Sequence, residues 1–127
     1  MSGHGAPARV IVCDDSPDLR AVVRMVLERD GTLQVVGEAG DASGAVALAA
    51  SERPDVIVLD LTMPGAEPDA LVSAVRTGAP DAGLIVYSGI APHRARDMLG
   101  DRGDVLHVPK TSPPRDLVAA VRSVTER

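Results

Sequence analysis

The chain has 127 residues, of which 45% are hydrophobic and 24% are charged, and its formal net charge at pH 7 is −5. This length and hydrophobic content predict one domain with a sizeable core and exclude the composition of disordered chains. The acidic balance excludes a general electrostatic footprint for phosphates, so we expect no direct nucleic-acid binding by this domain. No stretch approaches the roughly 20 apolar residues that span a bilayer, so we expect no membrane contact.

The first residues differ in character from the rest of the chain. We interpret residues 1–8 as a flexible leader, because they are mostly small and lack the apolar and basic regions of a signal peptide. Residues 9–127 are interpreted as one domain. Cys13 is the only cysteine and has no internal disulfide partner, which favours a reducing compartment and predicts a cytoplasmic location.

Short apolar runs alternate with amphipathic stretches along the chain. Apolar, often β-branched runs bounded by turn residues predict strands at 9–13, 33–36, 56–59, 84–87 and 105–108. Helical spacing and helix-boundary residues predict helices from Ser16-Pro17 to Asp30-Gly31, from near Ser43 to before Pro54, at 67–77, at 92–100 and from Pro114 onward. Five alternating pairs predict an α/β domain with a parallel sheet, helices on both faces and right-handed crossovers.

Polar side chains follow the predicted strands. Asp14 and Asp15 end the first strand, Asp60 the third and Ser88 the fourth, and Lys110 follows the fifth. Ligands of open α/β sheets bind outside the carboxyl ends of the strands, so we expect these groups to meet in one crevice. Crowded carboxylates raise each other's pKa unless a cation compensates, and Mg²⁺ binds through carboxylates and phosphate oxygens. The ligand set therefore predicts a magnesium-dependent phosphotransfer site.

These motifs, taken in order, resemble those of the CheY-like receiver domains of response regulators. The resemblance covers about residues 9–126 and is carried by Val10-Ile11-Val12-Cys13-Asp14-Asp15, Asp60-Leu61-Thr62-Met63-Pro64-Gly65, Ser88-Gly89 and Lys110. It implies a flavodoxin-like, doubly wound fold with five parallel strands in the order 2-1-3-4-5 and five flanking helices. The segment Val35-Val36-Gly37-Glu38-Ala39 resembles the receivers that precede helix-turn-helix transcription regulators.

The resemblance also implies a role for each polar residue. Asp60 would accept the phosphoryl group from the phosphohistidine of a sensor histidine kinase and would itself be a Mg²⁺ ligand. Asp15 would bind Mg²⁺ directly, Asp14 mainly through water, and Thr62 through its backbone carbonyl. Ser88 and Lys110 would each contact a phosphoryl oxygen. These roles agree with the dependence of phosphoryl transfer on positioning and on neutralised charge.

The chain departs from the family pattern three residues before the lysine. His107 stands where family members typically carry a tyrosine or phenylalanine that swings inward on phosphorylation. Tyr87 is the only aromatic residue and is expected on the sheet face opposite Ser88. His107 is interpreted either as a pH-sensitive replacement for that aromatic residue or as a partly exposed strand residue.

The same residues are open to simpler interpretations, and two other functions, an interaction module and a phosphatase, compete with the receiver. The aspartates are compatible with turns and helix caps, Ser88 with a cap and Lys110 with a surface lysine, but not as a set at successive strand ends. The missing aromatic residue favours a phosphate-independent interaction module. A haloacid-dehalogenase-type phosphatase needs a second acidic residue two positions after Asp60, where this chain has Thr62.

We therefore expect a phosphoacceptor rather than an enzyme, with self-catalysed phosphotransfer and autodephosphorylation. Phosphorylation is expected to change the surface formed by the fourth helix, the fifth strand and the last helix. That surface would act on an effector domain or an output protein, or would join two copies of the chain in a homodimer.

Overall fold

The computed structural model describes residues 6–100 and 104–126. Five strands form one parallel sheet in the order β2-β1-β3-β4-β5. The strands are β1 (Ala8–Cys13), β2 (Leu33–Ala39), β3 (Val56–Leu59), β4 (Gly83–Ser88) and β5 (Val105–Pro109). This confirms the expected flavodoxin-like, doubly wound α/β fold.

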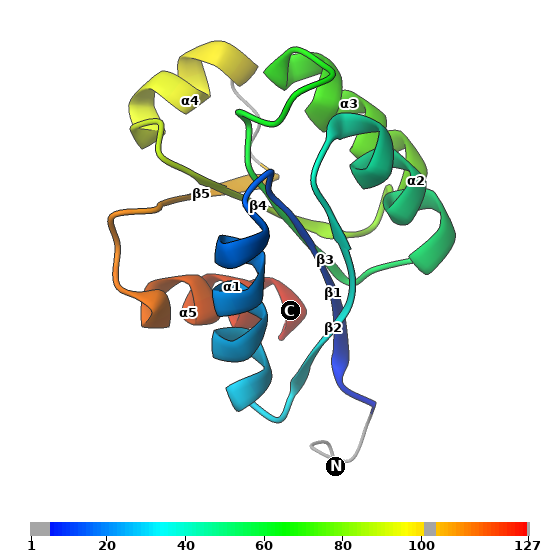
Figure 1. Cartoon of the computed structure of the whole chain (residues 1–127), viewed down its shortest axis with the longest axis vertical. Coiled ribbons are helices and arrows are strands. Elements are labelled where there is room, and N and C mark those ends of the chain that lie inside the picture. Colours follow the sequence, from blue (N-terminus) through cyan, green and yellow to red (C-terminus); the bar gives the residue numbers. More distant parts are fainter. Residues whose placement is uncertain (1–5, 101–103, 127) are drawn as a thin grey trace.

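Five helices cover the two faces of the sheet. They are α1 (Pro17–Arg29), α2 (Ala42–Glu52), α3 (Pro68–Gly78), α4 (Pro92–Leu99) and α5 (Pro114–Thr125). Figure 1 shows α1 and α5 on one side of the sheet and α2, α3 and α4 on the other. Within the described part of the chain, no helix has the length and apolar character needed to cross a membrane.

The central strands are buried on both faces, which is why their sequences are continuously apolar rather than alternating. Ile11 and Ile57 pack against the side that carries α2 and α3, whereas Val10 and Val58 pack against α1 and α5. Each such side chain, fully removed from water, contributes roughly 1.5–3 kcal/mol of transfer free energy. The two cores fix the sheet between its helix layers.

One predicted boundary was wrong, at the end of β2. The strand continues past Val36 to Ala39, because Gly37 and Glu38 pair with β1. Neither residue is apolar and β-branched, so the sequence pattern did not predict them as part of the strand. A Cβ atom on Gly37 would lie 3.1 Å from the Leu48 side chain, so the glycine allows α2 to approach closely. The helix α2 begins at Ala42, next to the expected start near Ser43, and the Asp41 carboxylate caps it by accepting the Gly44 N–H at 2.7 Å.

The ends of the chain are described only in part. The first strand begins at Ala8, one residue before its predicted start, because the Ala8 N–H donates to the Thr32 carbonyl at 2.9 Å. Residues 1–5 of the predicted leader lie outside the described residues, as does Arg127. The division into a leader and one domain stays a prediction.

Two side chains that the sequence singled out are buried in the sheet. Cys13 is 1% exposed, and burial raises the pKa of its thiol to about 12, so it is an unreactive apolar residue at neutral pH. Tyr87 packs in the core beneath α1 and α5, on the face opposite Val86. Its position is the one expected from strand alternation.

His107 lies on β5 opposite Val86 of β4 and is partly exposed. Its Nδ1 atom is buried and has no hydrogen-bond partner among the described residues. Burial, together with the nearby positive charge of Arg96, lowers the pKa of the imidazole below its usual value of 6.5. The native state therefore favours neutral His107.

This lowered pKa predicts a pH-dependent loss of stability. Unfolded His107 binds a proton more readily than folded His107, so stability should fall as pH drops below about 6.5, until the folded-state pKa is passed. His107→Gln should reduce this loss, measured as the change in urea midpoint between about pH 7.5 and about pH 5.5. His93→Gln, at an exposed position on α4, is the matched control. Equal slopes for wild type and His107→Gln would contradict the assignment.

Candidate functional site

Backbone hydrogen bonds hold two buried aspartates at the carboxyl ends of the central strands. The Asp14 N–H donates to the carbonyl of Ala39 on β2, and the Asp60 N–H donates to the carbonyl of Cys13 on β1, both at 2.9 Å. Asp14 is 4% exposed and Asp60 is 2% exposed. The parallel register thus places both carboxylates at the carboxyl ends of adjacent strands.

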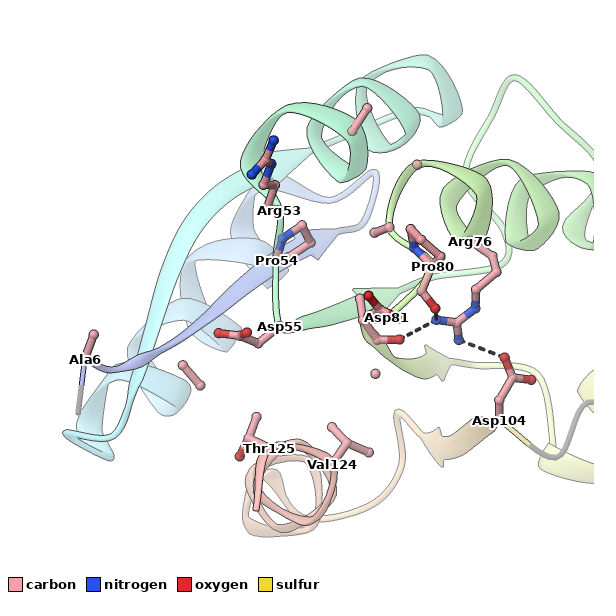
Figure 2. A pocket seen from close by; sticks show the side chains of 16 residues that line it. Ala6, Arg53, Pro54, Asp55, Arg76, Pro80, Asp81, Asp104, Val124 and Thr125 are labelled. Carbon is pink, nitrogen blue, oxygen red and sulfur yellow. Dashed lines mark hydrogen bonds and ion pairs between the residues drawn. The ribbon is translucent and has the colours of Figure 1, made fainter. Parts of the chain in front are cut away.

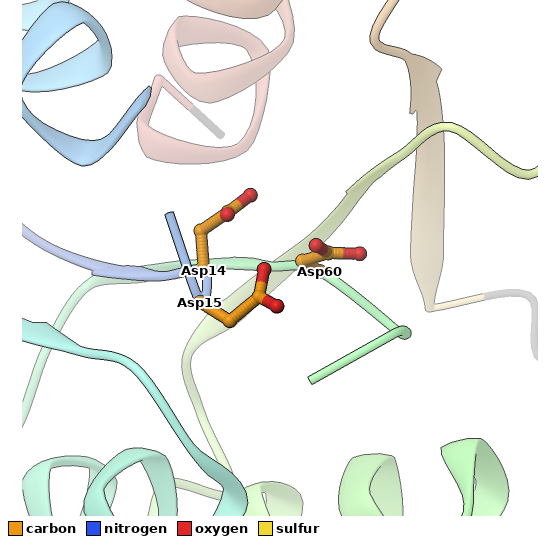
Figure 3. A group of neighbouring side chains, drawn as sticks. All are labelled: Asp14, Asp15 and Asp60. Atoms are coloured by element: carbon orange, nitrogen blue, oxygen red, sulfur yellow. The ribbon is translucent and has the colours of Figure 1, made fainter. Parts of the chain in front are cut away.

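Asp15 completes a cluster of three carboxylates. One carboxylate oxygen from each of Asp14, Asp15 and Asp60 lies within 4.8 Å of the other two. Figure 3 shows the Asp15 carboxylate turned toward the side on which Asp60 lies. Asp15 is exposed, whereas its two neighbours are buried, so the cluster opens to solvent through Asp15.

Lys110 connects the two buried carboxylates. Its Nζ lies 2.6 Å from Asp14 Oδ2 and 3.1 Å from Asp60 Oδ2. Its backbone N–H donates to the Ser88 carbonyl at 2.9 Å, which fixes the end of β5 beside the end of β4. Burial opposes the charged form of Lys110, but the two carboxylates outweigh it and raise the pKa of the ammonium group.

Thr62 holds the second oxygen of Asp60. The Thr62 N–H and hydroxyl both donate to Asp60 Oδ1, at 3.0 and 2.9 Å. Burial alone would raise the pKa of Asp60, but the bonds from Thr62 and Lys110 lower it below the usual value. Asp60 is therefore ionised at neutral pH. These two bonds were not predicted from the sequence, which pointed only to the Thr62 carbonyl, although the Asp-x-Thr turn pattern is their signal.

Asp14 is held on its other side by the loop that follows it. The Ser16 N–H donates to Asp14 Oδ1 at 2.9 Å, and the Ser16 hydroxyl accepts the Leu19 N–H at 3.2 Å, which caps α1. The Asp14 carbonyl accepts a hydrogen bond from the Arg20 guanidinium at 2.5 Å. Ser16 and Arg20 were not among the site residues predicted from the sequence.

Ser88 and Gly89 form the border of the site on β4. Ser88 is 1% exposed, and its hydroxyl accepts the Ile90 N–H at 3.1 Å. This bond holds the start of the loop between β4 and α4. Gly89 is exposed, and a Cβ atom there would meet nothing within 4 Å. The approach beside Ser88 is therefore open.

The charges in the cluster do not balance. Three carboxylates face one ammonium group, and two of the carboxylates are buried. A hard divalent cation with oxygen ligands is the partner that offsets such an excess most directly. The donor set of Asp14, Asp15 and Asp60, with backbone oxygens next to them, fits Mg²⁺.

A cavity of about 1140 Å³ lies at the other end of the strands, where β1, β3, β4 and β5 begin (Figure 2). Three of its charged side chains, those of Asp55, Arg76 and Asp104, contact other groups of the chain. Arg76 forms an ion pair with Asp104 at 2.9 Å, and Asp55 accepts the Arg9 N–H at 2.8 Å. These contacts connect α3 and β1 to neighbouring segments. Because they do not group nucleophilic or metal-binding side chains, we take the carboxylate cluster as the candidate site.

Comparisons with known proteins identify the family. Residues 10–122 match the family model described as "Response regulator receiver domain". The nitrate/nitrite response regulator protein NarP of Escherichia coli is 35% identical over 120 residues, which are 94% of this chain and 56% of NarP. Protein-glutamate methylesterase/protein-glutamine glutaminase 3 of Myxococcus xanthus is 39% identical over 92 residues, which are 72% of this chain and 26% of that protein.

Solved structures give the same result. The signal receiver domain of the putative response regulator NarL from Mycobacterium tuberculosis has a TM-score of 0.83 and 28% sequence identity, over 97% of this chain and 100% of that domain. The chain spans between about a quarter and a little over half of the two curated relatives described above. With its fold, its carboxylate cluster and the matched residues, the chain belongs to the family of response regulator receiver domains.

Proposed function

We propose that this receiver domain accepts a phosphoryl group on Asp60 from the phosphohistidine of a sensor histidine kinase. The observation that carries the proposal is the arrangement around Asp60. Its ionised carboxylate lies beside two further carboxylates and an ammonium group that is 3.1 Å from its Oδ2 atom. In the transfer, an Asp60 oxygen attacks phosphorus, the new P–O bond forms, the P–N bond breaks and the imidazole leaves.

The residues that would hold Mg²⁺ are Asp15 directly, Asp14 mainly through water, Asp60 and the backbone carbonyl of Thr62. The exposed position of Asp15 and the existing contacts of Asp14 with Ser16 and Lys110 support this division. When bound, the ion supplies positive charge next to the phosphoryl oxygens. Two Thr62 donors hold Asp60 Oδ1, so Oδ2 is the oxygen that we assign to the attack.

Lys110 and Ser88 are proposed to bind the transferred group. Lys110 already contacts Asp60 Oδ2, so its ammonium group can follow the negative charge from the carboxylate to a phosphoryl oxygen. The buried Ser88 hydroxyl can donate to another phosphoryl oxygen, and the exposed Gly89 leaves the approach open.

The competing proposal is a receiver-like module that works without phosphate. His107 in place of the switch aromatic residue favours it. The complete set of Asp14, Asp15, Asp60 and Lys110, with its close contacts, favours the phosphoacceptor. We regard this domain as a self-catalysing phosphoacceptor and not as an enzyme with a separate substrate.

The output is proposed to lie in another part of the signalling protein or in a partner protein. One relative is a methylesterase and another is a nitrate/nitrite response regulator, so receiver domains like this one are joined to different outputs. We propose that phosphorylation changes the surface of α4, β5 and α5, which contacts an effector or a second copy of the chain. A cytoplasmic location is part of the proposal, because the phosphodonor is a kinase domain of the cell interior.

The phosphoacceptor is tested by Asp60→Asn. This change removes the nucleophile while nearly keeping its volume, so phosphorylation should be abolished and the fold retained. Intact mass spectrometry after incubation with acetyl phosphate and Mg²⁺ should show one added phosphoryl group on wild type and none on Asp60→Asn. A variant that gains the group as fast as wild type would overturn the assignment.

The metal ligands are tested by comparing Asp15→Asn with Asp14→Asn. Asparagine at position 14 still accepts the Ser16 N–H, so the loop should be kept. Because only a water-mediated contact with the ion is weakened, Mg²⁺ affinity should fall by about 10-fold. Asp15→Asn should cost more, because a direct ligand is lost. Isothermal titration calorimetry measures both affinities. Equal losses would contradict the two assigned roles.

The signalling surface is tested by hydrogen exchange. A phosphoryl group adds roughly −1.5 to −2 charges at Asp60 and draws Ser88 and Lys110 toward it. Exchange should therefore change mainly in residues 88–115 when a phosphoryl mimic and Mg²⁺ are added, including the surface near Arg94, Arg96, His107 and Arg115. Changes confined to residues 17–50 would contradict this account.

A further inference from the structure

Arg20 lies at the junction between the acidic cluster and the edge strand β2. Its Nη1 donates to the Asp14 carbonyl at 2.5 Å, and its Nε contacts Glu38 Oε1 on β2 at 3.2 Å. The Arg20 side chain is 19% exposed and that of Glu38 is 27% exposed. One guanidinium therefore connects the loop that carries two aspartates to the edge strand.

The acceptor of this bond is the peptide group between Asp14 and Asp15. Because a peptide group is planar, fixing its carbonyl oxygen also fixes the direction in which the chain enters Asp15. The other polar groups of Asp14 are held by Ala39, Ser16 and Lys110. The Arg20 bond thus completes the fixation of Asp14 and sets the orientation of the next residue.

We propose that Arg20, held by Glu38, is a positioning residue that orients Asp15 for Mg²⁺; this inference rests on the proposed function. Gly40 supports it, because a Cβ atom there would lie 3.1 Å from Arg20 Nη1 and 3.8 Å from the Asp14 carbonyl oxygen. The absence of a side chain at position 40 leaves room for the guanidinium.

The chain offers a matched control one turn further along α1. Arg24 also forms an ion pair with Glu38, through Oε2 at 2.9 Å, and its other contacts are with Glu28 and the Val35 carbonyl. Arg24 is more exposed than Arg20, at 47%. Its removal takes away the same charge and the same ion-pair partner without touching the Asp14 carbonyl.

Charge and positioning predict opposite results for Mg²⁺. If Arg20 acted only through its charge, its removal would leave the acidic cluster more negative and would tighten Mg²⁺ binding. If it positions Asp15, its removal weakens Mg²⁺ binding. The sign of the change therefore separates the two roles.

The experiment measures Mg²⁺ affinity by calorimetry in wild type, Arg20→Met, Arg20→Lys and Arg24→Met. We expect Arg20→Met to bind about 10-fold more weakly and Arg24→Met to bind like wild type. Arg20→Lys keeps the charge but cannot contact Glu38 and the Asp14 carbonyl through separate nitrogens as Arg20 does, so its Mg²⁺ affinity should also fall. Unchanged or tighter binding by Arg20→Met would overturn the inference.

A second readout uses the metal-free protein. Amide exchange at Asp15 and Ser16 should be faster in Arg20→Met than in Arg24→Met, since only the former frees the loop. If Arg20→Met does not fold, Gly40→Ala displaces the guanidinium without removing it and should show the same two effects more weakly; wild-type behaviour in Gly40→Ala would then overturn the inference. Failure of wild type itself to bind Mg²⁺ would instead contradict the proposed function.

Discussion

The contact of Lys110 with Asp14 and Asp60 is the interaction on which the site depends. Two buried carboxylates at adjacent strand ends repel each other. The Lys110 ammonium group lies 2.6 Å from Asp14 and 3.1 Å from Asp60 and offsets this repulsion, and with the bonds from Thr62 it lowers the pKa of Asp60. The charge that remains in excess is open to solvent through Asp15, the position that we propose for a divalent cation.

The parallel sheet makes this contact possible. Asp14, Asp60 and Lys110 are far apart in sequence, yet each follows a strand that runs in the same direction. Strands buried on both faces cannot shift without exposing apolar side chains such as Ile11 and Ile57, so the carboxyl ends are held in a fixed relation. The loops that follow carry polar groups at little cost, because they leave the core at once.

Sequence patterns were sufficient for a parallel α/β sheet and for the convergence of the three aspartates, which follow from apolar runs, turn residues and the rule that ligands bind at the carboxyl ends of strands. The strand order 2-1-3-4-5 was predicted from the resemblance to receiver domains. The end of β2 was mispredicted because pairing with β1, and not local propensity, extends it through Gly37 and Glu38. Arg20 was missed for a similar reason, since its contacts depend on how α1 packs against β2.

The central claim is that Asp60 is the residue that becomes phosphorylated. Sodium borohydride reduces an aspartyl phosphate to homoserine, so treatment of acetyl phosphate-labelled protein, followed by peptide mass spectrometry, reads out the modified position directly. We expect homoserine at position 60 and unmodified aspartate at positions 14 and 15. Homoserine at either of those positions, with Asp60 intact, would contradict it.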